Sequence, residues 1–193
     1  STIKNGESVE IVTDAEKITE DFAEKCMDLN LRKDEAFTAL NKGYFDNAVG
    51  IKVAKGSENN SPIRVVHVVN GNQVLNQPRL MLLAEKGSSI EVLEHYLNDG
   101  DGGQNFTNVL NEYFLEQRSH VTIHQIIDEG LDNAHIQSSE AVQERNSKLT
   151  YYGYSLSGGL LRHNWDIAVR EEGCETELYG IMLASSKEHM DHH

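Results

Sequence analysis

Basic charge is scarce in this sequence, and so are long apolar runs. Its 193 residues include 17 Lys and Arg against 31 Asp and Glu, which gives a formal net charge of −14. Such a charge repels phosphate backbones and anionic membrane surfaces, so we expect neither a nucleic-acid nor a membrane partner. No apolar run approaches the roughly 20 residues of a membrane span, and the first residues lack the basic and apolar regions of a secretory signal. These absences predict a cytoplasmic location.

Cysteine is equally scarce. Cys26 and Cys174 lie far apart in the chain and form no CxxC pair, so neither a disulfide framework nor a zinc or cluster motif is encoded. We interpret each as a buried thiol. The motifs GxSxG, Walker A, HExxH and the Rossmann glycine pattern are absent as well. We therefore expect no catalytic, cofactor-binding or metal-binding residue in this chain, and no enzymatic activity.

What the sequence does contain is a repeated pattern. In the stretch 79–97, RLMLLAEKGSSIEVLEHYL, apolar residues fall at Ile90 and at two, three and seven positions after it. The same template fits four other stretches, and the five copies start 27, 31, 28 and 27 residues apart. A fixed period of this size is typical of stacked supersecondary units. The anchor positions are Ile63, Ile90, Val121, Leu149 and Thr176.

Each copy looks like a strand, a turn and another strand. Alternating apolar residues predict half-buried strands, and two adjacent apolar residues interrupt the alternation once per copy, as a corner or bulge does. Gly or Asn stands three positions before the anchor in four copies and suits a left-handed backbone, whereas Arg118 takes that place in the other copy. The pattern leaves open an antiparallel meander or sandwich of hairpins and a parallel β-helix. The constant phase favours the β-helix, with the five anchors stacked on one face.

A glutamate precedes every anchor by five positions. Stacked coils would place these like charges in a file, which costs energy unless solvent or neighbours such as Lys86 and Arg145 counter it. We interpret the position as a solvated turn. The five residues are Glu58, Glu85, Glu116, Glu144 and Glu171.

Residues 1–48 differ in kind from the rest. Apolar residues from Thr13 onward recur at helical spacing, and Thr13 or Asp14 is a suitable N-cap, so we expect two short helices. The strand-rich part occupies 49–193. The chain stops after the fifth copy with no capping element, which suggests a missing C-terminal part and predicts self-association through roughly 160–186.

Two metal hypotheses are weak. The segment 99–104, DGDGGQ, resembles a calcium loop, but Gly103 and Leu110 stand where an EF-hand needs oxygen ligands, so we interpret it as a surface turn. Among the histidines, only His95 and His124 come close in phase, at two positions predicted to face inward. Two nitrogens are too few for a closed site, so hydrogen-bonded core histidines are the favoured interpretation.

Several stretches resemble the SufB/SufD family of iron–sulfur cluster assembly proteins, and SufD more than SufB. They are DEAFTALNKGYFDNAVGIKVAKG (34–56), PRLMLLAEKGSSIEVLEHYL (78–97), FTNVLNEYFLEQRSHVTIHQI (106–126), YYGYSLSGGLLRHNWDIAV (151–169) and CETELYGIMLASSKEHMDHH (174–193). The resemblance implies a right-handed parallel β-helix preceded by the end of a helical region, which is the mainly β fold we expect. It also implies a non-catalytic scaffold that acts with a SufB-like paralogue and a SufC-like ATPase. The family's assembly-site residues would lie beyond this chain, so no cofactor is expected in it.

Two other functions remain open. A carbohydrate-active β-helix enzyme would need paired carboxylates beside an open groove. A stand-alone metal-binding protein would need converging His or Cys side chains.

Overall fold

The computed structural model describes residues 2–5, 8–27, 29, 31, 35–45, 47–59, 61–100, 103–185 and 187–193. Two helices and fourteen strands are assigned within these residues. The helices are α1 (Ala15–Phe22) and α2 (Ala36–Tyr44). The strands are β1 (Thr2–Asn5), β2 (Val9–Val12), β3 (Asn47–Val53), β4 (Ile63–Val69), β5 (Leu75–Asn76), β6 (Pro78–Ala84), β7 (Ser89–Asn98), β8 (Phe106–Leu115), β9 (His120–Asp128), β10 (Ala134–Gln143), β11 (Lys148–Ser157), β12 (Leu160–Val169), β13 (Glu175–Met182) and β14 (His189–His192).

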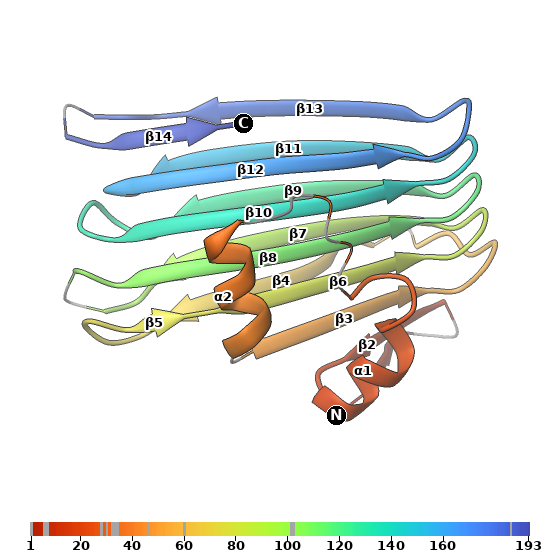
Figure 1. Cartoon of the computed structure of the whole chain (residues 1–193), viewed down its shortest axis with the longest axis horizontal. Helices are drawn as coiled ribbons and strands as arrows, with labels where there is room; N and C mark the ends of the chain where they lie inside the picture. The colour runs from red at the N-terminus through yellow and green to blue at the C-terminus, as the bar shows by residue number, and fades with distance from the viewer. Residues whose placement is uncertain are drawn as a thin grey trace.

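From β3 onward the strands form a parallel solenoid. Sheet A has the order β1-β2-β3-β6-β8-β10-β12-β14, with β5 attached to β8, and sheet B has the order β13-β11-β9-β7-β4. Successive long strands alternate between the two sheets, so the chain makes about five turns (Figure 1). Strands β6 and β7 lie in different sheets, which rules out the hairpin alternative across 85–89. The predicted mainly β solenoid, with short helices before it, is confirmed.

The predicted stacking of anchors holds for four of the five. Ile90 pairs with Val121, Val121 with Leu149, and Leu149 with Thr176. Ile63 does not join this file, because it pairs with Val92. The first turn bridges Glu58 to Ser89 and therefore uses two more residues than its neighbour before the strands pair.

The predicted interruption of alternation is also wrong for the copy anchored at Ile90. Strands β7 and β9 pair in continuous register from Ser89 to Leu97, without a bulge. Val92 faces the interior and is fully buried, whereas its apolar neighbour Leu93 faces outward and is half-buried. Two adjacent apolar residues therefore serve opposite faces of one regular strand.

The turns that lead from sheet A to sheet B share one left-handed position. Gly56, Gly87, Arg118, Asn146 and Gly173 all have positive φ, between 57° and 74°. The left-handed position predicted three residues before the anchor is thus confirmed for Gly87, Asn146 and Gly173, and Arg118 adopts it too despite its side chain. In the first coil, Gly56 fills this role.

The file of turn glutamates has four members instead of five. In three turns the backbone carbonyl of the glutamate accepts the N–H of the serine that stands three residues later; these glutamates are Glu85, Glu116 and Glu144. In the first coil, Ala54 accepts the equivalent N–H from Ser57, so Ala54 takes the place of a glutamate and Glu58 lies outside the file. Carboxylates of this file accept backbone N–H groups of the preceding coil. The pairs are Lys55 with Glu85, Lys86 with Glu116 and Arg145 with Glu171, at 3.0, 2.9 and 3.0 Å.

The helices cover the outer face of sheet A (Figure 1). Asp14 caps α1 by accepting the N–H of Lys17, as predicted from the sequence. Ile18, Phe22 and Cys26 are buried together against outward-facing residues of the sheet. Those sheet residues are Met81, Leu83, Phe114 and Val142. Two helices were expected here and both are present; the antiparallel strands β1 and β2 were not expected.

Candidate functional site

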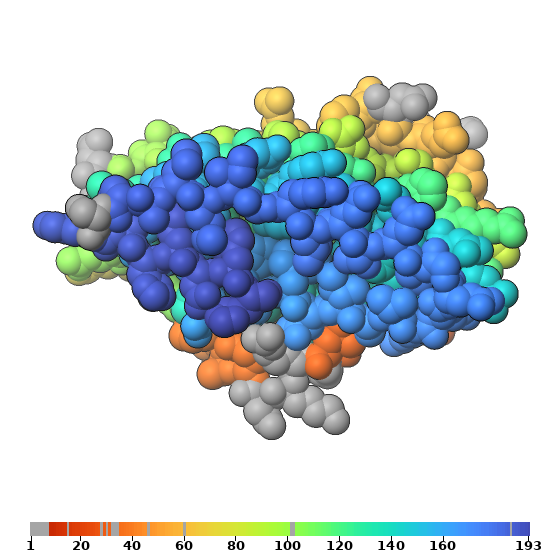
Figure 2. Space-filling view, turned by 90° about the horizontal axis from the view of Figure 1, so that it is seen from above, coloured from red at the N-terminus to blue at the C-terminus, as the bar shows by residue number. Residues whose placement is uncertain are grey.

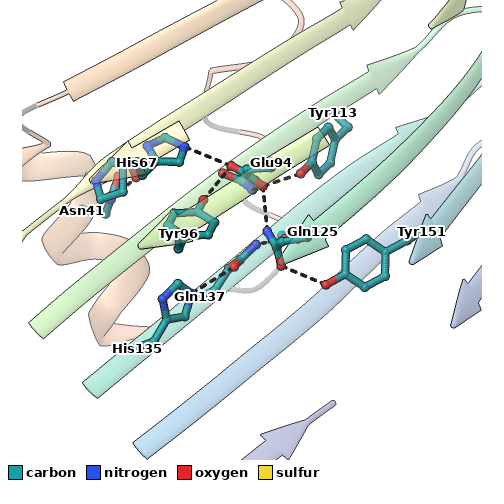
Figure 3. A network of polar contacts seen from close by, with 12 residues as sticks. Asn41, His67, Glu94, Tyr96, Tyr113, Gln125, His135, Gln137 and Tyr151 are labelled. Atoms are coloured by element: carbon teal, nitrogen blue, oxygen red, sulfur yellow. Dashed lines mark hydrogen bonds and ion pairs between the residues drawn. The ribbon is translucent and has the colours of Figure 1, made fainter. Parts of the chain in front are cut away.

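A network of polar side chains runs through the interior of the solenoid (Figure 3). Alternation along β7 directs Ile90, Val92, Glu94 and Tyr96 inward, and all four are buried. The first two belong to the apolar core, whereas Glu94 meets polar groups of neighbouring and facing strands and Tyr96 donates to Glu94. The interior is therefore apolar toward the turns that lead into β7 and polar toward its far end.

Glu94 is the hub of this network. One carboxylate oxygen accepts from Tyr96 Oη at 2.6 Å and lies 3.3 Å from His67 Nε2. The other accepts from the amide nitrogens of Asn111 at 2.9 Å and Gln125 at 2.7 Å. Strands β4, β7, β8 and β9 supply these four partners, so one buried carboxylate ties both sheets together.

From this hub the network crosses to later coils. Tyr151 donates to the Gln125 side-chain oxygen at 2.8 Å and lies 3.2 Å from His163 Nδ1. The other ring nitrogen of His163 lies 2.9 Å from Ser139 Oγ, which accepts from Gln137 at 3.0 Å.

A second buried carboxylate ends this branch. His135 lies 3.2 Å from the Gln137 oxygen through Nε2 and 2.9 Å from Glu129 through Nδ1. Thr107 donates to the other oxygen of Glu129 at 2.8 Å. Both carboxylates, Glu94 and Glu129, thus have partners on both oxygens.

Electrostatics favour an ionised Glu94. Burial alone would raise the pKa of this carboxyl, but the hydrogen bond and charge of His67, with the Tyr96 and Gln125 hydrogen bonds, outweigh it and hold the pKa below its usual value. The pKa values of Tyr96 and Tyr113 are raised well above the usual range, first by burial and then by the Glu94 charge. The tyrosines therefore remain protonated donors around a fixed anion.

The Ser139–His163 pair resembles half of a hydrolase triad but lacks access to a substrate. Both side chains are fully buried. Burial first, and then the nearby histidines His192 and His135, lower the pKa of His163 well below its usual value, so it is neutral. Nucleophilic catalysis requires the nucleophile to reach a bound substrate. The pair therefore serves packing and hydrogen bonding in this structure.

Described residues line two surface cavities, one away from the interior network and one that reaches it at His67. One, at the last coils, is lined by Tyr152, Tyr154, Tyr179 and Ile181 with two glycines. The other lies beside β4 and contains His67 among its lining residues. Neither lining includes a carboxylate, so neither offers the acid pair that glycoside hydrolysis uses.

A separate buried ion pair lies between sheet A and its helical cover. Arg79 donates from Nε and Nη2 to one oxygen of Glu112, at 2.9 and 2.7 Å, and both side chains are buried. The backbone N–H of Leu29 approaches the other Glu112 oxygen at 3.4 Å, and that of Leu31 approaches Glu140 at 3.3 Å. These contacts fasten the segment between the helices to the sheet.

The two cysteines lie in unrelated places. Cys26 is buried against sheet A, where its thiol donates to the Leu82 carbonyl at 3.6 Å and burial raises its pKa. Cys174 lies in the turn between β12 and β13, only partly buried, with its thiol 3.0 Å from the Glu144 carbonyl. The prediction of a buried thiol is thus confirmed for Cys26 and wrong for Cys174. Within the described part of the chain, no group of three or more His, Cys, Asp or Glu side chains converges on a metal position.

The two candidate histidines face outward, which corrects the predicted inward orientation. His124 pairs in register with Leu93, and His95 with Ile126, so the rings occupy different rows of the outer face of sheet B. His124 contacts Glu91 instead, at 3.1 Å. The calcium-like segment 99–104 includes residues 101 and 102, which lie outside the described residues.

Sequence reasoning missed the interior network because it followed apolar residues only. In IEVLEHYL the apolar template selects Leu93 and Leu97, yet strict alternation from Ile90 selects Glu94 and Tyr96. Polar residues in the inward phase were the available signal.

Among the described residues, no helix is long and apolar enough to cross a membrane.

Comparisons with known proteins place the chain in one family. The model of the family "SUF system FeS cluster assembly, SufBD core domain" matches residues 67–193. An iron–sulfur cluster assembly SufBD family protein of Synechocystis is 27% identical over 169 residues, which cover 82% of this chain and 37% of that protein. The chloroplastic protein ABCI7 of Arabidopsis thaliana is 24% identical over 119 residues, 62% of this chain and 25% of that protein.

The chain thus spans between a quarter and two fifths of the length of these relatives. The family match begins at His67 in β4 and continues through the last described strand, β14. It therefore covers nearly the whole solenoid, including every residue of the interior network. The chain belongs to the SufBD family of SUF-system iron–sulfur cluster assembly proteins.

Proposed function

We propose that this protein acts as a non-catalytic, SufD-like scaffold of the SUF system, in a complex with a SufB-like paralogue and a SufC-like ATPase. Family membership supports a scaffold role. The observation that carries the proposal is the solenoid interior, whose chemically active side chains are bonded to one another and, apart from His67 at the edge of one surface cavity, buried. What remains available to other molecules is the outer surface, as a scaffold requires.

The cysteines support the same proposal. Cluster ligation ordinarily uses about four thiolates or a His/Cys mixture converging on the irons. Cys26 and Cys174 belong to different parts of the molecule, since Cys26 packs with α1 against sheet A and Cys174 lies in the turn before β13. We infer that the iron–sulfur cluster is a product handled by the whole complex, with no cofactor resident in this chain.

A cytoplasmic location is part of the proposal. Both cysteines are free, which suits a reducing compartment. One relative is named as chloroplastic, so a plastid location is the alternative that localisation of a tagged protein would distinguish.

Co-expression with the SufB-like and SufC-like proteins of the same host tests the complex. We expect the three proteins to co-elute in size-exclusion chromatography with a fixed stoichiometry. A matched control is the interior variant Ser139→Ala, which leaves the outer surface unchanged and should still assemble. If the folded protein elutes alone in the presence of both candidates, the SufD-like assignment is wrong.

A further inference from the structure

The two sheets end at different levels at the N-terminal end of the solenoid. Sheet A continues past β3 through β2 and β1, whereas β4 is the last strand of sheet B among the described residues (Figure 1). Val9 of β2 belongs to the interior core, and Ile11 packs against it. Strands β1 and β2 therefore form a ledge, the N-terminal ledge, that projects beyond the edge of sheet B.

The edge of β4 carries unpaired backbone groups. The Val69 carbonyl accepts the N–H of Asp99 on the β7 side. Because N–H and C=O groups alternate in direction along a strand, those of Arg64, Val66 and Val68 point away from β7. No strand in the described part of the chain pairs with this edge.

The residues of β4 favour strand addition. Its sequence, IRVVHVV, has no Gly or Pro and is rich in β-branched residues. Val66 and Val68 are 45% and 54% exposed. An exposed regular edge of this kind is a template for another strand.

A cavity beside the same edge offers a place for a side chain. It has a volume of about 270 Å³, and its lining includes Val49, Val65, His67 and Pro78. Val49 and Val65 pack against the interior core from opposite sheets. An added strand would direct alternate side chains into this cavity, which is how strand-addition sites obtain specificity.

We propose that the free edge of β4 binds one extended segment of a partner polypeptide, which adds to sheet B as a further strand opposite the N-terminal ledge. The segment would place an aliphatic side chain in the cavity and a carboxylate beside exposed Arg64. Charge complementarity supports this chemistry, because Arg64 is exposed on β4, the His67 ring is already paired with Glu94, and β4 carries no acidic residue.

A second copy of this chain does not fit the same edge. Antiparallel pairing of two β4 strands requires a two-fold axis perpendicular to sheet B. Both N-terminal ledges would then project past the shared edge into the same space, since each extends sheet A by two strands. A single extended segment meets no such obstacle.

The test uses a short fluorescent peptide of alternating Val and Thr with one central Asp, and the same peptide N-methylated at alternate residues along one edge. Anisotropy should report saturable binding of the first peptide, and N-methylation should weaken it at least about tenfold. Amide hydrogen exchange should show new protection at Arg64, Val66 and Val68. The matched variants are Val66→Pro, which removes an outward N–H and should weaken binding as N-methylation does, and Val66→Thr, which keeps it and should bind normally.

Three results would overturn the proposal. One is the absence of binding to the wild-type protein up to about 1 mM peptide. Another is equal binding of the N-methylated and unmethylated peptides. This comparison uses the wild-type protein, so it holds even if Val66→Pro does not fold. The third is concentration-dependent protection of the β4 amides without peptide, because it would place a second copy at this edge.

Discussion

Replacing Glu94 with Gln tests the hub of the interior network. The carboxylate is fully buried and has two partners on each oxygen. Gln keeps the shape, but its NH₂ group would face two donors, either His67 and Tyr96 or Asn111 and Gln125. A hydrogen bond to a charged group contributes about 1.5–3 kcal/mol, so the loss of two amounts to about 3–6 kcal/mol. Easier burial of the neutral amide offsets part of this, and we expect the free energy of unfolding to fall by about 3 kcal/mol at pH 7.

The effect should depend on pH in a defined direction. The pKa of Glu94 is lowered in the folded protein, so its stabilisation is present above the unfolded pKa of about 4.3 and is lost as pH falls through the lower folded pKa. The difference between wild type and Glu94→Gln should therefore be full at pH 7 and shrink below about pH 4.

Urea unfolding followed by circular dichroism, repeated across pH, measures this difference. The matched control is Glu91→Gln on the same strand, because Glu91 faces outward, is 46% exposed and pairs with His124 at the surface. Such a pair contributes about 0–1 kcal/mol. A Glu94→Gln effect no larger than that of the control, or one independent of pH, would refute a stabilising buried anion.

The remaining predictions concern other parts of the molecule. Arg79→Met should cost about 3–5 kcal/mol in urea unfolding, because it removes the Arg79 half of a buried ion pair with Glu112. Adding Glu112→Leu should recover most of the loss, and a double variant as unstable as the single one would contradict this. Gly87→Ala should destabilise the protein by about 1–2 kcal/mol, because φ of Gly87 is +70°. Gly43→Ala in α2, where there is open space, should stabilise it by up to about 1 kcal/mol. Thermal melts that rank the two variants the other way would contradict the need for a left-handed residue at position 87. Tyr179, Ile181 and Leu183 are exposed apolar residues of the last coil, at the end of the solenoid that Figure 2 faces, so light scattering at micromolar concentration should show a dimer that Ile181→Lys shifts toward monomer; a monomer throughout would refute this interface.

The repeat made most of the fold predictable from sequence. Period and phase placed four anchors in one file, and glycine or asparagine marked the left-handed turn position. The register of the first coil was not predicted, because its turn uses two extra residues. A template of fixed spacing therefore selected Ile63 and Glu58, whereas the structure uses other positions. Strands β1 and β2 were not predicted either, although the sequence Asn5-Gly6 between two alternating runs is a hairpin signal.

The interior network was not predictable from apolar periodicity. Glu94, Gln125 and His163 occupy core positions where a pattern search expects apolar residues. A polar residue is tolerated there only when partners from other coils satisfy its hydrogen bonds. For Glu94, the partners Asn111 and Gln125 lie 17 and 31 positions further along the chain. Such pairing depends on register between coils, which a single strand does not encode.

Cluster assembly in a defined mixture tests the scaffold role most directly. Iron, sulfide and reductant would be supplied anaerobically to the SufB-like and SufC-like proteins with and without this protein, and cluster would be followed by visible absorbance. We predict no stoichiometric cluster on this protein alone, more cluster on the mixture when it is present, and the same increase with a Cys26→Ser/Cys174→Ser variant. A stoichiometric cluster on the isolated protein that is lost with Cys174→Ser would contradict the proposed role.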